Sequence, residues 1–400
     1  MKNNHQEVVI RIHTDPTSIE EREWDDLLAQ QAQGSPFMRH AYLVALHRSG
    51  SAIGRTGWNP AFVTLWRDDK LQAACALYLK THSYGEYVFD WAWANAYAEH
   101  GLEYYPKAVV AAPFTPVPGA RLLARTPEDR LELARALVAW CEAQGLSSLH
   151  LLFAASEDVD ACREAGLMLR HTVQFHWHNR LPQRYADFDS FLASLSQEKR
   201  KKIRQERRKV TEAGVVFRSL QGQAIRDADW DFFYRCYERT YLEHGNAPYL
   251  TRDFFRRMQS EMAENWLLFI AERDNAPIAA SLIALSSPNE RERVAYGRYW
   301  GALERVDCLH FEACYYQPLA WCIAHAIDRF EGGAQGEHKM ARALMPVSTT
   351  SAHWLARADF SDAVERFLER EGSGIADYME HLEARSPFRQ EKASAAPGEP

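Results

Sequence analysis

Two stretches of the chain share one pattern of apolar and polar positions. In residues 61–79, an apolar run is followed by the polar turn 67–70 and by a second apolar run. Residues 267–285 repeat this pattern around the turn 273–276. Two apolar runs joined by a polar, Asp-containing turn are typical of a β-hairpin. The sequence therefore predicts one hairpin in each half of the chain.

An aromatic stretch follows each predicted hairpin, at residues 87–93 and 294–300. Aromatic residues favour strands, so each stretch is predicted to be a further strand that leads into a helix. The order in both halves is then helix, hairpin, aromatic strand, helix, strand. We interpret this order as an internal duplication of one α/β unit. The alternative is coincidence between two common patterns.

Apolar residues at helical spacing predict helices at 127–144, 188–213, 228–244 and 311–329. Pro318 lies inside the last of these and should kink the helix or end its first segment. A linker between the halves is expected at 179–187, where Pro182 and polar residues follow the apolar strand 173–178. A strand is expected around residues 329–331.

The composition is that of a globular protein long enough for two domains: 400 residues, 46% hydrophobic and 25% charged. The net charge of −7 argues against general nucleic-acid binding, so any anion site must come from local clustering. The seven scattered cysteines form no C-x-x-C pair, which indicates a reducing compartment. No apolar stretch reaches 18 residues, so we expect no membrane span and a cytoplasmic location.

Several short phrases together give the sequence a family likeness. They are 35–38 (SPFM), 55–58 (RTGW), 78–91 (YLKTHSYGEYVFDW), 104–107 (YYPK), 113–116 (PFTP), the basic run 199–209, 310–317 (HFEACYYQ), 333–339 (GAQGEHK) and 351–354 (SAHW). With these phrases the chain resembles, from residue 35 to about residue 388, the bacterial N-acyltransferase family assigned to peptidoglycan biosynthesis or recognition. That family is related to the Fem-type aminoacyl transferases of the GNAT superfamily.

The resemblance implies an α/β fold of two GNAT-like halves with mixed, mostly antiparallel sheets. The expected division is residues 1–183 and 184–388, followed by a disordered tail, 389–400. It also implies transfer of an acyl or aminoacyl group to an amine acceptor such as a peptidoglycan precursor. Two alternatives remain: a binding protein that keeps the fold without catalysis, and a CoA-dependent N-acetyltransferase.

Residues 310–316 (HFEACYY) are the densest candidate for acyl-transfer chemistry, which needs a base for the attacking amine and donors for the oxyanion. Glu312 and Tyr316 fall one turn apart on one helix face, so Glu312 is the candidate base and Tyr315 or Tyr316 the candidate acid. His310 is assigned to the same catalytic group. Alternatively, Glu312 only favours a helix N-terminus and Tyr315 belongs to the core.

Two other readings of the same segment are weaker. The alternation of Cys308, His310, Glu312 and Cys314 could suggest a metal site, but no second pair with ligand spacing stands out. A nucleophilic pair of Cys314 and His310 would indicate a hydrolase, and nothing else in the sequence supports it.

Residues 332–339 (GGAQGEHK) follow the strand expected around 329–331. Their three glycines let main-chain N–H groups turn toward an anion, and Lys339 adds a positive charge. We therefore expect Lys339 to share one cleft with Glu312 as a catalytic residue, and Gln335, Glu337 and His338 to bind substrate. The alternative is an ordinary solvated turn.

The glycine-rich loop by which acetyl-CoA users hold a pyrophosphate is missing before residue 310. Residues 305–310 (RVDCLH) contain no glycine, and Asp307 and Glu312 would repel a pyrophosphate. This departure favours aminoacyl-tRNA as the donor over acyl-CoA.

Eight of the eleven residues 199–209 are Lys or Arg, in a protein that is acidic overall. Like charges at helical spacing repel each other, so a phosphate-bearing partner such as tRNA would stabilise this helix. Arg200, Lys201, Arg204 and Arg208 are the expected contacts, and the alternative is a solvated face. In the first half, Asp90 is predicted to lie in mid-strand, either in a structural salt link or at the acceptor.

Overall fold

The computed structural model describes residues 8–179, 183–287, 290–333 and 336–389. Gln335, three residues of the expected linker (180–182) and residues 390–400 of the expected tail lie outside this part of the chain. Among the described residues, no helix is long and apolar enough to cross a lipid bilayer.

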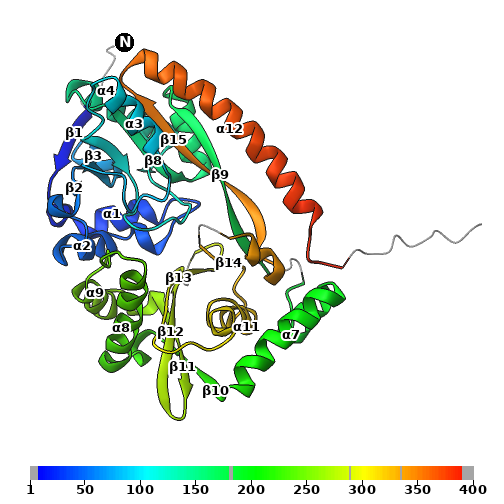
Figure 1. The fold of residues 1–400 in the computed structure, drawn as a ribbon. Helices are drawn as coiled ribbons and strands as arrows, with labels where there is room; N and C mark the ends of the chain where they lie inside the picture. Colours follow the sequence, from blue (N-terminus) through cyan, green and yellow to red (C-terminus); the bar gives the residue numbers. More distant parts are fainter. Residues whose placement is uncertain (1–7, 180–182, 288–289, 334–335, 390–400) are drawn as a thin grey trace, which may run out of the picture.

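The strands form two sheets (Figure 1). The smaller sheet contains, in spatial order, β1 (Val8–His13), β3 (Phe62–Arg67), β4 (Lys70–Cys75) and β7 (Leu123–Ala124). The larger sheet contains, in spatial order, β10 (Val215–Gln221), β11 (Trp266–Arg273), β12 (Ala276–Leu285), β13 (Val294–Ala302), β14 (Arg329–Glu331), β9 (Met168–His178), β15 (Met345–Leu355), β8 (Ser148–Ala154), β6 (Lys107–Val110), β5 (Leu77–Lys80) and β2 (Trp58–Pro60).

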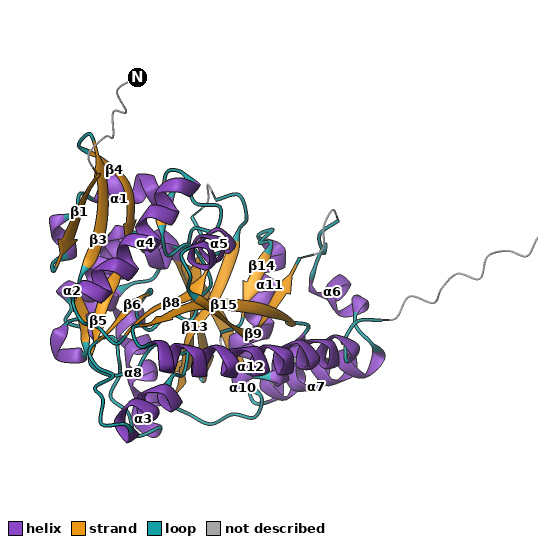
Figure 2. Ribbon diagram, turned by 90° about the horizontal axis from the view of Figure 1, so that it is seen from above, coloured by secondary structure: helices purple, strands orange, loops and turns teal. Residues whose placement is uncertain are grey.

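The helices lie on both faces of these sheets (Figure 2). They are α1 (Glu21–Leu28), α2 (His40–Arg48), α3 (Trp91–Glu99), α4 (Pro127–Ala143), α5 (Ser156–Glu164), α6 (Phe188–Ser194), α7 (Gln197–Glu212), α8 (Asp227–Glu243), α9 (Arg252–Glu261), α10 (Leu309–Phe311), α11 (Gln317–Ala324) and α12 (Ala358–Ala384). The α/β class is confirmed, and so are the helices predicted at 127–144 and 228–244.

Both predicted hairpins are present, as β3–β4 and β11–β12. Each turns through two residues with positive φ, Asp68 and Asp69 in the first and Asp274 and Asn275 in the second. Two such residues give the turn the twist that a two-residue hairpin requires, and Asp and Asn adopt this conformation more readily than other side chains do.

The strand pairing repeats in the two halves, which confirms the duplication. β6 pairs parallel with β8, and β13 pairs parallel with β14, while the other pairs between named strands are antiparallel. The last strand of each repeat is exchanged. β9, from the first half of the sequence, pairs with β14, whereas the C-terminal β15 pairs with β8. β9 and β15 also pair with each other, so the larger sheet runs through both halves (Figure 1). The division at 183/184 stays a prediction.

The aromatic strand predicted at 87–93 is wrong. Residues 87–90 are irregular, with positive φ at Tyr87, and α3 begins at Trp91. The ring of Trp93 and that of Tyr97, one turn later, pack in one cluster with Val364 and Leu368 of α12, so tertiary packing overrides the strand preference of aromatic residues. Asp90 therefore precedes a helix and does not lie in mid-strand.

Two predicted helices are interrupted. Residues 188–213 form α6 and α7, separated at Leu195, which bridges to Phe388. Residues 311–329 contain a π-helical turn, Glu312–Tyr316, and then α11, which ends at Ala324. Pro318 is the second residue of α11, directly after the π-helical turn, so the helix changes type beside this proline; the expected kink stays a prediction.

The largest core cluster joins the two halves. The ring of Phe37 packs edge-on against that of Tyr296 at 5.3 Å, and the ring of Tyr42 against that of Phe254 at 5.4 Å. A second cluster lies under α6, the π-helical turn and α11. An interface with an apolar core of this kind holds the halves in a fixed arrangement.

Candidate functional site

The parallel strands β13 and β14 pair only over residues 294–296 and 329–331. β13 then continues to Ala302, while Gly332 and Gly333 follow β14. A Cβ atom at Gly332 would lie 2.4 Å from Leu344 Cδ2, so a larger residue there would have to displace the Leu344 side chain. At Gly297, on the facing strand, a Cβ would lie 3.2 Å from the ring of Phe330. Where the two strands part, each therefore has a glycine, which leaves main chain accessible at this point.

Lys339 lies against this point from the α11 side of the sheet. It belongs to the 3₁₀ turn Glu337–Arg342, is buried, and donates a hydrogen bond through Nζ to the carbonyl oxygen of Gly333 at 2.8 Å. The Lys339 stem packs against Gly332, where a Cβ would lie in van der Waals contact with Lys339 Cδ at 3.4 Å. Burial lowers the pKa of Lys339 to about 8.

His310 lies near the same place. Its ring lies 5.5 Å from that of Trp300 and 5.7 Å from that of Tyr315. Burial, together with the nearby His338 and Arg342, lowers the pKa of His310 to about 4. The imidazole is therefore neutral at pH 7. His338 is exposed, and its Nε2 lies 3.2 Å from the Tyr315 hydroxyl.

Glu312 is held by α7. Its Oε1 accepts hydrogen bonds from Arg207 Nε at 3.2 Å and from Gln317 Nε2 at 2.7 Å, while Oε2 accepts from Arg207 Nε at 3.2 Å. Both oxygens are occupied, and Glu312 is 3% exposed. This geometry suits Glu312 to orienting Arg207 better than to removing a proton.

Tyr316 also contacts α7, which agrees with its predicted position on the same helix face as Glu312. Its hydroxyl donates to Glu206, which in addition accepts from Arg342 Nη2 at 2.9 Å. Tyr316 is 1% exposed, so it fastens the π-helical turn to α7 and is poorly placed to protonate a leaving group.

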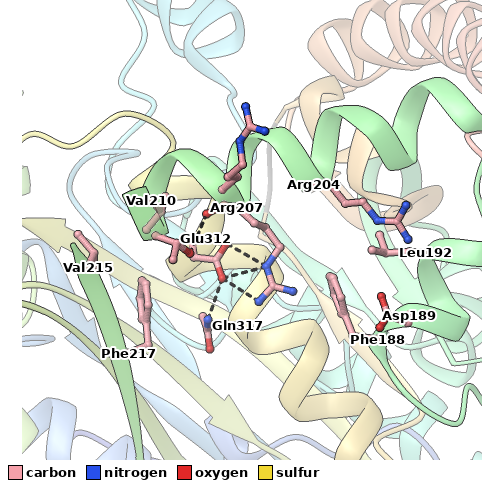
Figure 3. A pocket seen from close by; sticks show the side chains of 12 residues that line it. Phe188, Asp189, Leu192, Arg204, Arg207, Val210, Val215, Phe217, Glu312 and Gln317 are labelled. Atoms are coloured by element: carbon pink, nitrogen blue, oxygen red, sulfur yellow. Dashed lines mark hydrogen bonds and ion pairs between the residues drawn. The ribbon is translucent and has the colours of Figure 1, made fainter. Parts of the chain in front are cut away.

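The basic helix α7 borders a cavity of about 410 Å³ on the outer side of the Glu312–Arg207 pair (Figure 3). Among the residues that line it are Phe188, Arg204, Arg207, Arg208, Glu312 and Gln317. Of the predicted phosphate contacts, Arg204 and Arg208 border the cavity, whereas Arg200 and Lys201 do not line it. Arg207 was missed, because its neighbours in the sequence look the same and only the fold turns it inward.

Glu312 and Lys339 were predicted to share one cleft, but among the described residues the cavity at Glu312 is not such a cleft. Lys339 is not among the residues that line the cavity at Glu312. Lys339 lies within electrostatic range of Cys314, whereas Glu312 turns to α7. Residues two apart on a helical turn point to different sides, and this separates the two groups.

The remaining predicted residues lie apart from Lys339. Glu337 is exposed and accepts hydrogen bonds from Tyr378 at 2.7 Å and from Arg385, near the end of α12, at 3.4 Å. Asp90 is buried in the first half, where it accepts from Lys107 and, at 2.7 Å, from the Tyr104 hydroxyl. Burial alone would raise the pKa of Asp90, but the Lys107 ammonium holds it below its usual range. Asp90 therefore belongs to a buried salt link with Lys107, in which its Oδ1 has no hydrogen-bond partner among the described residues.

A cleft of about 1230 Å³ lies between the halves, on the face of the sheet opposite to Lys339. Residues from α1, α5, β9, β14 and β15 line it, among them Glu331, Arg329 and His176. Glu331 was also missed from the sequence. The sequence does place a carboxylate at the end of a predicted buried strand, directly before two glycines. An ionised group is unfavourable in such a position unless it is paired, and this could have marked Glu331 as a candidate.

Comparison of the chain with known protein families identifies one family that matches nearly its whole length. A model of the FemAB-like family, described as peptidoglycan biosynthesis/recognition, matches residues 15–390. No curated protein sequence matches the chain.

Among solved structures, the chain is similar to FemX, with a TM-score of 0.53 and 10% identity over 90% of this chain and 100% of that one. It is similar to L-PGS from Bacillus licheniformis, with a TM-score of 0.52 and 11% identity over 95% and 100% of the two chains. It is also similar to the C-terminal domain of a lysylphosphatidylglycerol synthetase from Agrobacterium fabrum, with a TM-score of 0.51 and 11% identity over 86% and 94%. At such identities these likenesses show a shared fold.

Proposed function

The chain belongs to the FemAB-like family, and we propose that it transfers an aminoacyl group from a charged tRNA to a side-chain amine of a peptidoglycan precursor. Fem-type N-acyl transfer is the reaction class of this family. The identity of the donor, the identity of the acceptor and the roles of individual residues are the proposed part.

The position of Lys339 carries the proposal. Amide formation passes through a tetrahedral oxyanion, and a preorganised cation in a water-poor site stabilises that charge. Lys339 is buried where β13 and β14 part, its Nζ is already directed at the main chain of Gly333, and with a pKa of about 8 it is mostly protonated at pH 7. Lys339 therefore provides the oxyanion donor, while the neutral His310 and the Tyr315 ring wall the site.

The choice of tRNA as donor rests on α7. The segment before α10 has no glycine-rich loop that would hold a pyrophosphate. Arg204 and Arg208 are exposed beside the cavity, while Glu312 fixes Arg207 between them. Exposed arginines one turn apart suit successive phosphates of a nucleic-acid backbone.

The test is a transfer assay with radiolabelled aminoacyl-tRNAs and a lysine-containing, nucleotide-linked muropeptide. The expected result is label in the muropeptide and release of uncharged tRNA. Acyl-CoAs serve as the competing donors. Transfer from acyl-CoA alone would establish a CoA-dependent enzyme, and tight muropeptide binding without turnover from any donor would establish a binding protein; either result would overturn the proposal.

A further inference from the structure

Glu331 is a buried carboxyl group with one free oxygen at the floor of the cleft between the halves. It is 3% exposed, and its Oε2 has no hydrogen-bond partner among the described residues. Its Oε1 lies 3.2 Å from Arg329 Nε, but Arg329 also pairs with Glu292 at 2.6 Å. One guanidinium is therefore shared between two carboxylates, and the charge of Glu331 is only partly offset.

The neighbours of Glu331 leave it poised to exchange a proton near neutral pH. His176 Nε2 lies 3.9 Å from Oε2, but burial lowers the pKa of His176 to about 3, so this imidazole carries no charge at pH 7. Burial raises the pKa of Glu331 to about 7, against the opposing effect of Arg329. The charged and titratable groups that face it are Arg329 on its own strand, Glu292 before β13, Tyr296 and Arg298 on β13, His176 on β9 and Arg121 from the first half.

Glu331 and Lys339 lie on opposite faces of one strand end. Side chains alternate along a strand, so Phe330 and Gly332 point toward α11 and Lys339, while Glu331 points into the cleft. Lys339 Nζ donates to the carbonyl oxygen of Gly333, only two residues after Glu331, so the two groups approach the same strand end. A reacting centre between the strand ends can thus receive one substrate from each face.

We propose that Glu331 is the proton acceptor of the reaction and that the cleft between the halves admits the acceptor as a primary amine. This inference rests on the proposed function. A primary ammonium group carries three N–H donors and a positive charge, which suits the free carboxylate oxygen of Glu331. Carboxyl groups tuned to a pKa near the working pH are the most effective proton acceptors.

The step balances as follows. The amine nitrogen attacks the carbonyl carbon of the aminoacyl ester and forms the C–N bond, and the C–O bond to the ribose breaks. Before the attack the bound ammonium gives one proton to Glu331, and exchange with solvent restores the carboxylate. After the attack the nitrogen gives a second proton to Glu331, which passes it to the leaving ribose oxygen. The products are an amide and an uncharged tRNA.

The first experiment tests the amine site without catalysis. Calorimetry measures binding of Nα-acetyl-lysine methylamide, with the norleucine analogue, which lacks the amine, as the matched ligand. The lysine probe is expected to bind more tightly as the pH rises through 7, and Glu331→Gln should weaken it at least about tenfold while binding of the norleucine analogue is unchanged. Equal affinity of wild type and Glu331→Gln for the lysine probe would overturn the proposal.

The second experiment uses the transfer assay. Glu331→Gln should lower kcat by about 10²- to 10⁴-fold and remove the decline in rate below pH 7. Glu292→Gln is the matched comparison, because it leaves the proton acceptor in place but frees Arg329 to pair with Glu331 alone; it should keep kcat at high pH and move the decline in rate to a lower pH. A Glu331→Gln protein with wild-type kcat and pH profile would refute the role of Glu331 and leave the proposed function standing. Absence of transfer from every donor, with amine binding that still needs Glu331, would refute the proposed function and leave the amine site.

Discussion

The proposed role of Lys339 depends on its positive charge. The transfer rate should therefore change with the protonation of this residue. Burial lowers its pKa from 10.5 to about 8, and the ammonium form is the one that can bind an oxyanion. The transfer rate should therefore fall as the pH rises above about 8. Lys339→Met should lower kcat by about 10²- to 10³-fold, the usual effect of losing one oxyanion donor, and should abolish that alkaline decline.

The melting temperature of Lys339→Met distinguishes a loss of catalysis from misfolding. A depressed lysine pKa means that the folded state disfavours the ammonium, so the methionine variant should melt no lower than the wild type at pH 7. Lys70→Met, an exposed change in the first hairpin turn, is the control and should leave kcat unchanged. Unaltered kcat in Lys339→Met would contradict the assignment.

Glu331 should make the protein less stable in its active, ionised form. Its folded pKa of about 7 exceeds the ordinary value of 4.5, so its contribution to stability is fully present below pH 4.5 and is lost as the pH rises through 7. The shift corresponds to about 3 kcal/mol at pH 8. Glu331→Gln should therefore raise the free energy of unfolding, measured in urea, by more at pH 8 than at pH 5. An equal effect at both pH values would show that the Glu331 carboxyl titrates in the ordinary range.

At the scale of single residues, the sequence allowed candidate residues to be recognised but did not predict their contacts. Lys339 was recognised because it follows a strand and three glycines, which are local features. Glu312 was recognised as well, but its ion pair with Arg207, which turns the carboxylate away from Lys339, depends on α7, about a hundred positions earlier in the chain. Glu331 was missed because its burial and its free oxygen depend on how the halves pack.

At the scale of elements, α7 offers a test of the donor. Reversing two charges in Arg204→Glu with Arg208→Glu should weaken binding of the aminoacyl-tRNA and reduce the slope of log affinity against log salt by about 1 to 2, as expected for two lost phosphate contacts. The matched control is Arg366→Glu with Arg370→Glu, which has the same spacing on exposed positions of α12. Both double variants should fold, since all four side chains are exposed. Equal salt dependence in the two variants would leave α7 as a solvated face.

Helix boundaries show where sequence reasoning ends at this scale. The apolar positions of 188–213 continue through Leu195, yet the bridge between Leu195 and Phe388 breaks the helix there. The π-helical turn at Glu312–Tyr316 likewise depends on tertiary contacts: Tyr316 bonds to Glu206 and Glu312 to Arg207, both on α7. The local sequence does not predict it. The hairpins, in contrast, were predicted correctly because their turns and alternating runs are local.

At the scale of the whole molecule, the duplication was visible in the sequence, but the strand exchange was not. A repeat predicts that each unit has the same strands in the same order. It does not say which copy a strand pairs with, because the pairing depends on how the two halves pack. The exchange places β9 between β14 and β15, so the segment just before the expected boundary completes the sheet of the other half.

This exchange predicts that the halves depend on each other for folding. A fragment of residues 1–183 would lack β15 beside β8, and would expose the rings of Phe37 and Tyr42 that pack on Tyr296 and Phe254. A fragment of residues 184–400 would lack β9 beside β14, leaving an unpaired edge next to the site. Each fragment expressed alone should therefore aggregate or show no cooperative unfolding, whereas the two co-expressed fragments should associate into a soluble complex with the circular dichroism spectrum of the intact chain. The intact chain carrying a protease site within 180–182 is the control, since cleavage after folding should leave the complex together. A cooperative melting transition in either fragment alone would show that the halves are independent domains and that the exchanged strands contribute little to their stability.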